Sequence, residues 1–114
     1  MPRTEFNILL AAALAFAAGE ATAQAGRTIA PGAVHEECVK LAPSKKLNYS
    51  FNAETPLDFN IHYHRGNDVV YPVKRNGVKS GAAGFVAKLG HEYCMMWTNP
   101  TRKAATLTYR FAVE

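Results

Sequence analysis

The 114-residue chain is predicted to be an all-β protein: an antiparallel β-sandwich of about seven strands with one disulfide, behind an N-terminal signal peptide. Two observations support this class. Apolar and polar residues alternate with a period of two over most of residues 36–114, as in strands with one face on a core and one in water. Gly, Pro and Asn interrupt these segments at short intervals, as turns do.

The first 25 residues are typical of a secretory signal peptide. An apolar run over residues 8–18 follows a head that contains Arg3, and Ala23 and Ala25 offer the small side chains that signal peptidase accepts. This run is too short to span a bilayer, which needs roughly 20 residues. We therefore expect an exported chain without a transmembrane segment after processing. A flexible N-terminal arm is expected over residues 26–35 and one small domain over 36–114.

The strand pattern is clearest in the middle of this domain. Apolar side chains stand at odd positions from Leu47 to Ala53, and after Pro56 the same alternation resumes from Leu57 to Tyr63. The odd-numbered side chains are therefore expected in the core. The expected strands are residues 37–41, 47–54, 57–64, 68–74, 85–89, 92–98 and 105–113.

Turn-forming residues separate these strands. Residues 65–67 are expected to form a turn, and Asn76-Gly77 is a strong tight-turn signal. Residues 81–84 are glycine- and alanine-rich and are predicted as a loop. Pro72 cannot donate a ladder hydrogen bond, so its strand is expected at a sheet edge or at a bulge.

The chain has two cysteines, Cys38 and Cys94, near the two ends of the predicted domain. In an oxidising compartment an isolated pair most simply forms a disulfide. Closing a loop of about 57 residues would stabilise the fold by about 4 kcal/mol in the chain-entropy model. Two free thiols acting as metal ligands are the alternative.

Several motifs occur in an order that is found in one known family. Glu37-Cys38 precedes an aromatic strand with Tyr49 and Phe51, then the extended segment 57–61, and then residues 90–99, GHEYCMMWTN, before a last alternating strand. This order resembles the GOLD (Golgi dynamics) domain, the lumenal β-sandwich of transmembrane cargo proteins of the early secretory pathway. The resemblance covers about residues 36–113 and implies a non-catalytic interaction module with a Cys38–Cys94 bridge. We expect no counterpart here of that family's transmembrane helix, coiled coil or cytosolic tail.

The sharpest candidate for site chemistry is the pair His62 and His64. In a strand these side chains point to the same face, about 6–7 Å apart, and two such imidazoles can bind one copper or zinc ion. The alternation places the pair on the exposed face. Candidates for a third ligand are His35, Asp58, His91, Met95 and Met96. The simpler interpretation is that the histidines decorate a solvated face and the methionines fill the core, with no cofactor bound.

Catalytic motifs are weak in this sequence. No serine has a Gly-x-Ser-x-Gly setting, and residues 81–84 lack the Lys-Ser/Thr ending of a phosphate loop. The net charge of +4 favours weak attraction to anionic partners, but the basic residues cluster at turns, where lysines usually protect sheet edges. We expect no nucleic-acid partner.

The sequence therefore predicts an exported, non-catalytic binding module of the periplasm, the cell envelope or the extracellular space, with an unidentified protein or glycan partner. The alternative is a small periplasmic copper- or zinc-binding protein that uses His62 and His64.

Overall fold

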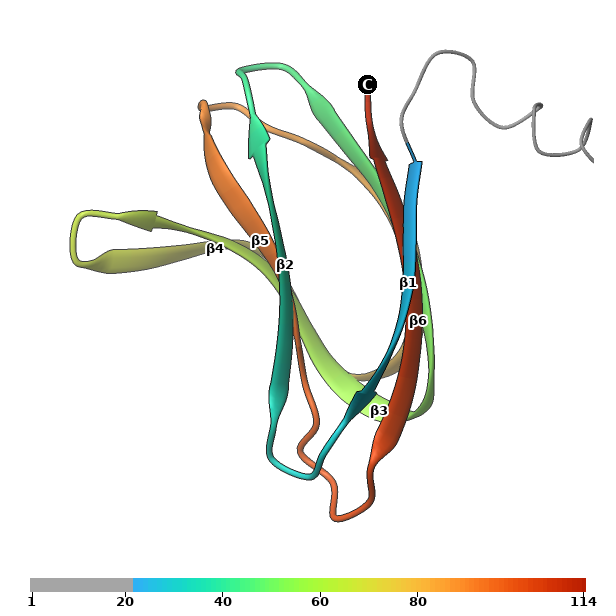
Figure 1. Ribbon diagram of the computed structural model, residues 1–114. Coiled ribbons are helices and arrows are strands. Elements are labelled where there is room, and N and C mark those ends of the chain that lie inside the picture. Colours follow the sequence, from blue (N-terminus) through green and yellow to red (C-terminus); the bar gives the residue numbers. More distant parts are fainter. Residues whose placement is uncertain (1–21) are drawn as a thin grey trace, which may run out of the picture.

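The computed structural model describes residues 22–114, which form six antiparallel β-strands and contain no helix (Figure 1). The strands belong to one sheet in the order β1-β6-β3-β5-β2, and β4 pairs with the other edge of β3. The predicted all-β antiparallel class is confirmed. The strands are β1 (Thr22–Ile29), β2 (Val34–Leu41), β3 (Lys46–Arg65), β4 (Asp68–Val86), β5 (His91–Thr98) and β6 (Ala105–Val113).

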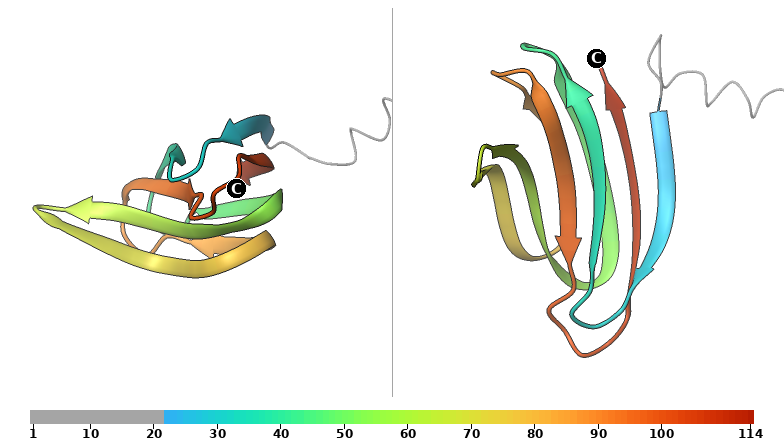
Figure 2. Two further views of the ribbon diagram at one scale, coloured as in Figure 1. Left: turned by 90° about the horizontal axis from the view of Figure 1, so that it is seen from below. Right: turned by 60° about the vertical axis from the view of Figure 1, so that its left-hand side comes forward.

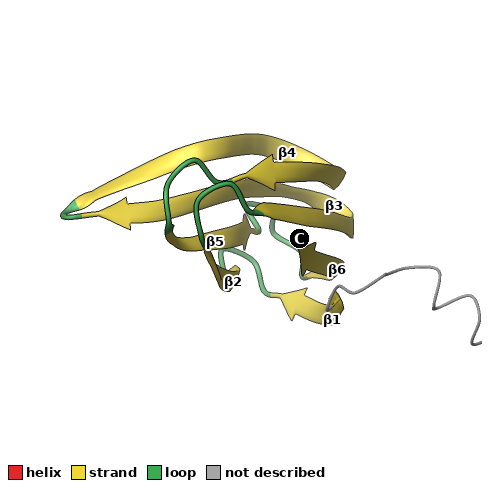
Figure 3. Cartoon of the chain, turned by 90° about the horizontal axis from the view of Figure 1, so that it is seen from above, coloured by secondary structure: helices red, strands yellow, loops and turns green. Residues whose placement is uncertain are grey.

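The long strand β3 organises the fold. Its first half, residues 47–53, pairs with β6, and its second half, residues 58–62, pairs with β5 along the same edge. The sheet therefore bends within β3 into two facing layers, one with β1 and β6 and the other with β2 and β5. Strand β4 follows the bend on the opposite edge of β3, and Figures 2 and 3 show this curved ribbon from three directions. Register shifts along β3 and β4 mark bulges, which bend and twist paired strands.

The core lies between the two layers and includes most of the side chains that the alternation predicted, together with Ile29 from the segment predicted as a flexible arm. Leu47, Leu57 and Ile61 of β3 are completely buried, and so is Trp97 of β5. The Trp97 ring lies 5.3 Å from that of Phe59 between ring centroids. This alternation could be recognised from the sequence because each layer has one face on the core and one face outside.

The Cys38–Cys94 disulfide is confirmed, with an S–S distance of 2.04 Å. Cys38 of β2 pairs directly with Cys94 of β5, so the bridge joins two adjacent strands of one layer. It therefore reinforces strand pairing within a layer and does not join the two layers.

The prediction of seven strands was wrong in detail, because two pairs of predicted strands are continuous. Residues 47–54 and 57–64 form the single strand β3, which passes through Pro56 at the bend. Proline is tolerated there because the β3–β4 ladder is interrupted between Asn52 and Leu57, where no N–H is required.

Strand β4 likewise merges segments that were predicted to be separate. The Asn76-Gly77 signal corresponds to a bulge within β4, where Gly77 has a φ of +67° and its N–H donates to the Asp58 carboxylate at 2.9 Å. Residues 81–84, predicted as a loop, pair with residues 48–51 of β3. The turn predicted over residues 65–67 is confirmed between β3 and β4.

The flexible arm predicted over residues 26–35 was also wrong. Gly26–Ile29 belong to β1, which pairs with β6, and Val34 begins β2. Strand pairing uses backbone groups, so β1 needs no alternating side-chain pattern. The predicted signal peptide, residues 1–25, lies outside the described residues except for 22–25, which begin β1. Within residues 22–114, we find no helix with the length and apolar character needed to cross a membrane.

Candidate functional site

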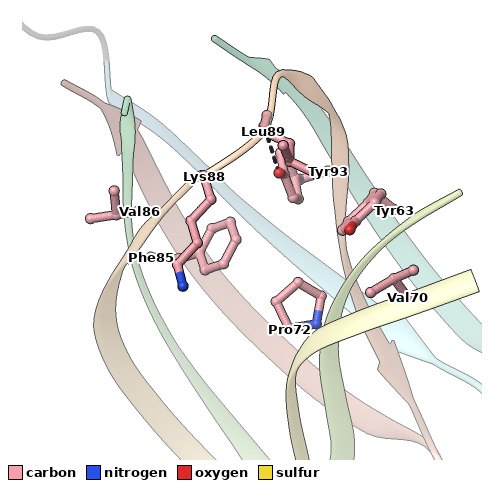
Figure 4. A pocket seen from close by; sticks show the side chains of 8 residues that line it. All are labelled: Tyr63, Val70, Pro72, Phe85, Val86, Lys88, Leu89 and Tyr93. Atoms are coloured by element: carbon pink, nitrogen blue, oxygen red, sulfur yellow. Dashed lines mark hydrogen bonds between the residues drawn. The ribbon is translucent and has the colours of Figure 1, made fainter. Parts of the chain in front are cut away.

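A half-open pocket of about 580 Å³ lies beside β4, between the two layers (Figure 4). The bend of β4 produces it, because Val70 and Pro72 come from the beginning of the strand and Phe85 and Val86 from its end. The volume falls within the range of sites that bind small molecules or side chains of a partner. The lining residues are Tyr63, Val70, Pro72, Phe85, Val86, Lys88, Leu89 and Tyr93.

Aromatic rings form a rigid wall of this pocket. The Tyr93 ring lies 5.2 Å from both Tyr63 and Phe85 between centroids, in edge-on arrangements that aromatic pairs prefer. The Tyr93 hydroxyl donates to the Leu89 carbonyl at 2.7 Å, which holds the loop between β4 and β5 against the wall. Burial raises the pKa of Tyr93, so the hydroxyl stays neutral. The wall is therefore formed before any ligand arrives.

The rim of the pocket is apolar and exposed. Val86 and Leu89 are 53% and 50% exposed and both line the pocket, so they present apolar surface to solvent at its rim. Lys88 contributes the one charged group among the lining residues (Figure 4). No lining residue is a carboxylate, histidine, serine or cysteine, so the pocket offers a surface for binding an apolar group and no nucleophile–base pair.

A second cluster lies on the outer face of the β2–β5–β3 layer, around His62. Its Nδ1 is 2.7 Å from Asn60 Oδ1, and its Nε2 is 3.1 Å from Glu36 Oε2. Burial lowers the pKa of His62, and the Glu36 carboxylate opposes that shift. Because both ring nitrogens face oxygen atoms, the imidazole is held in one orientation.

The expected exposure of the histidine pair was wrong for His62, which is 4% exposed. Two neighbours cover this position on the outer face. The Tyr71 ring of β4 lies 5.8 Å from the His62 ring, and Glu36 reaches over it from β2. His64 is exposed, with its ring 5.5 Å from that of His62. The alternation predicts correctly that the His62 side chain points away from the core. Long side chains of other strands in the sheet can still bury a residue on that outer face.

The predicted third ligands are distributed over different parts of the fold. Met95 is buried in the core, and His91 stacks on Tyr63 at 4.4 Å beside the pocket. Met96 shares the outer face, since it pairs with Asn60, and Asp58 caps the Gly77 bulge. The neighbour that sequence reasoning missed is Glu36. Its spacing of two from Cys38 was the available signal, because it places both side chains on one face of β2.

His35 belongs to a separate polar network that joins the two layers. The Tyr109 hydroxyl of β6 donates to Glu37 Oε1 of β2 at 2.6 Å, so His35 Nε2 donates to the Tyr109 oxygen at 2.9 Å. Burial, followed by the hydrogen bond to Glu37, raises the pKa of Tyr109 to about 12. Burial and Arg27 lower the pKa of His35. This network holds the layers together on the side away from β4.

Comparison with known proteins shows the fold. No family model and no curated protein sequence matches the chain. Two solved structures with this fold are PliG, a periplasmic lysozyme inhibitor of g-type lysozyme, from Aeromonas hydrophila and from Salmonella Typhimurium. The first has a TM-score of 0.61 at 11% identity and covers 87% of this chain and 91% of that chain. The second has a TM-score of 0.61 at 16% identity and covers 87% and 93%.

A third similar structure is the pre-peptidase C-terminal domain of a collagenase from Bacillus anthracis. Its TM-score is 0.59 at 15% identity, and the match covers 82% of this chain and 89% of that chain. At such identities these similarities show the fold alone.

Proposed function

We propose that the protein is an exported, non-catalytic binding module that holds an apolar group of a protein partner in the pocket beside β4. The observation that carries this proposal is the preformed, aromatic-walled pocket of about 580 Å³ with an exposed apolar rim. Covering an exposed leucine or valine contributes about 1–2 kcal/mol each, and a rigid wall lowers the ordering cost of binding.

Several features support a partner that is a protein in the cell envelope. The predicted signal peptide and the disulfide suit export. The PliG structures are those of periplasmic proteins that inhibit another protein, and the GOLD-like motif order also suggests an interaction module. A glycan would need several hydrogen-bonding groups, whereas the lining is mostly hydrocarbon.

The proposal is tested with the fluorescent probe 8-anilino-1-naphthalenesulfonate, an aromatic group with an anionic substituent. Val70→Trp fills the pocket, and Val69→Trp is the matched control, because Val69 is 39% exposed and pairs with His64 on the outer face. We expect Val70→Trp to weaken probe binding at least about tenfold and Val69→Trp to leave it unchanged. Equal dissociation constants for the two variants would refute the pocket as the binding site.

Export is tested separately by mass spectrometry of the protein recovered from its native host. The expected result is a mature chain that begins close to residue 26, and an intact Met1 would contradict it.

A second candidate function is copper or zinc binding around His62. The specific observation is the 3.1 Å contact between its Nε2 and Glu36 Oε2, because an oriented imidazole beside a carboxylate is a common beginning of a metal site.

A further inference from the structure

Three potential metal-binding side chains occupy one row across three adjacent strands. Cys38 of β2 pairs with Cys94 of β5, and Cys94 pairs with His62 of β3. Glu36, two residues before Cys38, lies on the same face. One ligand atom from each of Glu36, His62 and Cys94 lies within 4.8 Å of the other two, and Cys38 Sγ is bonded to Cys94 Sγ.

We propose that reduction of the Cys38–Cys94 disulfide converts this cluster into a zinc site with four protein ligands. The ligands are the two cysteine thiolates, His62 Nε2 and the Glu36 carboxylate. Thiolate, imidazole and carboxylate are the ligands that zinc takes in tetrahedral protein sites, whereas a disulfide supplies no thiolate. The inference rests on the second candidate function and is independent of the pocket.

The redox step needs a dithiol reductant. The dithiol transfers two electrons and two protons to the disulfide and becomes a cyclic disulfide itself, while the Cys38–Cys94 bond breaks to give two thiols. Zn²⁺ then displaces both thiol protons as two zinc–sulfur bonds form, so binding releases two protons per ion. A water-soluble dithiol and a zinc salt therefore suffice for the reaction.

The surroundings of His62 already prepare it as a ligand. Asn60 Oδ1 accepts a hydrogen bond from His62 Nδ1 at 2.7 Å, which leaves Nε2 directed toward Glu36. A hydrogen bond from the ring nitrogen that does not bind the metal sets the tautomer and the ring orientation of a ligating histidine. His62 and Cys94 are 4% and 6% exposed, while the Glu36 side chain is 42% exposed and provides the route of entry for the ion.

The strands themselves hold these groups in place. Strand β2 pairs with β5 from Val34 to Leu41, over its whole length, and β5 pairs with β3 beside His62. The positions of the ligands therefore depend on backbone pairing, and breaking the S–S bond requires only that the two sulfur atoms separate.

The experiment compares zinc binding to the oxidised protein and to dithiol-reduced, desalted protein without oxygen. We expect one Zn²⁺ per reduced chain with a Kd below about 1 µM, release of two protons, and at least about 100-fold weaker binding to the oxidised chain. Co²⁺ in place of Zn²⁺ should show thiolate-to-metal charge-transfer absorption. In the reduced protein His62→Gln, Glu36→Gln and Asn60→Ala should each weaken zinc binding by about 10–100-fold.

The matched control is His64→Gln, an exposed histidine on the same face of β3, which should leave zinc binding unchanged. Equal losses for His62→Gln and His64→Gln would overturn the proposal, as would a reduced chain without stoichiometric zinc. Should the reduced chain unfold, zinc must restore the near-UV circular dichroism of buried Trp97, and failure to do so also overturns it. Equally tight binding by the oxidised chain would reject the thiolate site but keep metal binding as a function.

Discussion

Gly81 is the position at which the observed strand pairing makes the sharpest stability prediction. Gly81 pairs with Phe51, and a methyl group added to it would lie 2.7 Å from Cε2 and 2.9 Å from Cζ of the Phe51 ring. That ring is 2% exposed and is packed 4.8 Å from Phe59 and 5.8 Å from Trp97 between centroids. Gly81→Ala therefore requires a core ring to move.

The magnitude follows from two opposing effects. Overpacking a core costs about 1–3 kcal/mol, and replacing glycine by alanine recovers about 0.5–1 kcal/mol by restricting the unfolded chain. The expected net loss is about 1–2 kcal/mol, and each kcal/mol lowers the Tm of a domain of this size by about 4–8 °C. Gly84→Ala is the matched control, since its methyl group would meet the ends of two polar side chains and no core ring: Cε of the flexible Lys46 side chain at 2.5 Å and Oδ1 of Asn48 at 3.0 Å.

The assay is urea unfolding of both variants, followed by tryptophan fluorescence and far-UV circular dichroism. Gly84→Ala should be as stable as the wild type or slightly more stable. A double-mutant cycle with Phe51→Leu should show that the Gly81→Ala penalty becomes smaller when the ring is removed. If Gly81→Ala is no less stable than Gly84→Ala, residues 81–84 do not pack against Phe51, and the assigned strand register is refuted.

Three further predictions concern buried polar groups. Asn99→Ala should cost about 2–3 kcal/mol in urea unfolding, because the fully buried amide donates to backbone carbonyls of β1 and of the β5–β6 loop, and a loss below 1 kcal/mol would contradict this. Tyr109→Phe should cost about 1–3 kcal/mol by removing the hydroxyl that joins Glu37 to His35, and unchanged stability would mean that the network contributes nothing. Burial lowers the pKa values of His35 and His62 below 6.5, so the unfolded chain takes up protons first. The contribution of these two histidines to the free energy of unfolding is therefore complete above pH 6.5 and declines as the pH falls toward their pKa values in the folded state. A Tm that stays constant between pH 7 and 5 would refute this prediction.

Local chemistry alone was enough to predict the class of the fold and the contents of its core. Among the odd-numbered apolar residues of β3, Leu47, Phe51, Leu57, Phe59 and Ile61 are buried and Tyr49 and Ala53 are half-buried, because a strand alternates its faces with a period of two whatever it pairs with. The pairing of Cys38 with Cys94 needed no more than an oxidising compartment and the presence of two cysteines.

Strand continuity depended on long-range pairing and could not be predicted from local signals. Pro56, Gly77 and Gly81 are local turn signals, yet all three lie inside continuous strands. Bulges accommodate Pro56 and Gly77, and Gly81 provides room for the Phe51 ring. A turn signal records what the backbone tolerates locally, and only the partner strand decides whether the chain reverses there.

The candidate sites depended on the tertiary structure in the same way. The histidine pair was recognisable in the sequence, but its neighbour Glu36 lies 26 residues away in the chain from His62. Glu36 reaches His62 only because β5 pairs with both β2 and β3 and holds them in one layer. The pocket forms because β4 bends and faces itself across the gap between the layers. Alternation determines which face of a strand each side chain occupies; the register and curvature of the sheet, set by hydrogen bonds between distant segments, decide what each face meets.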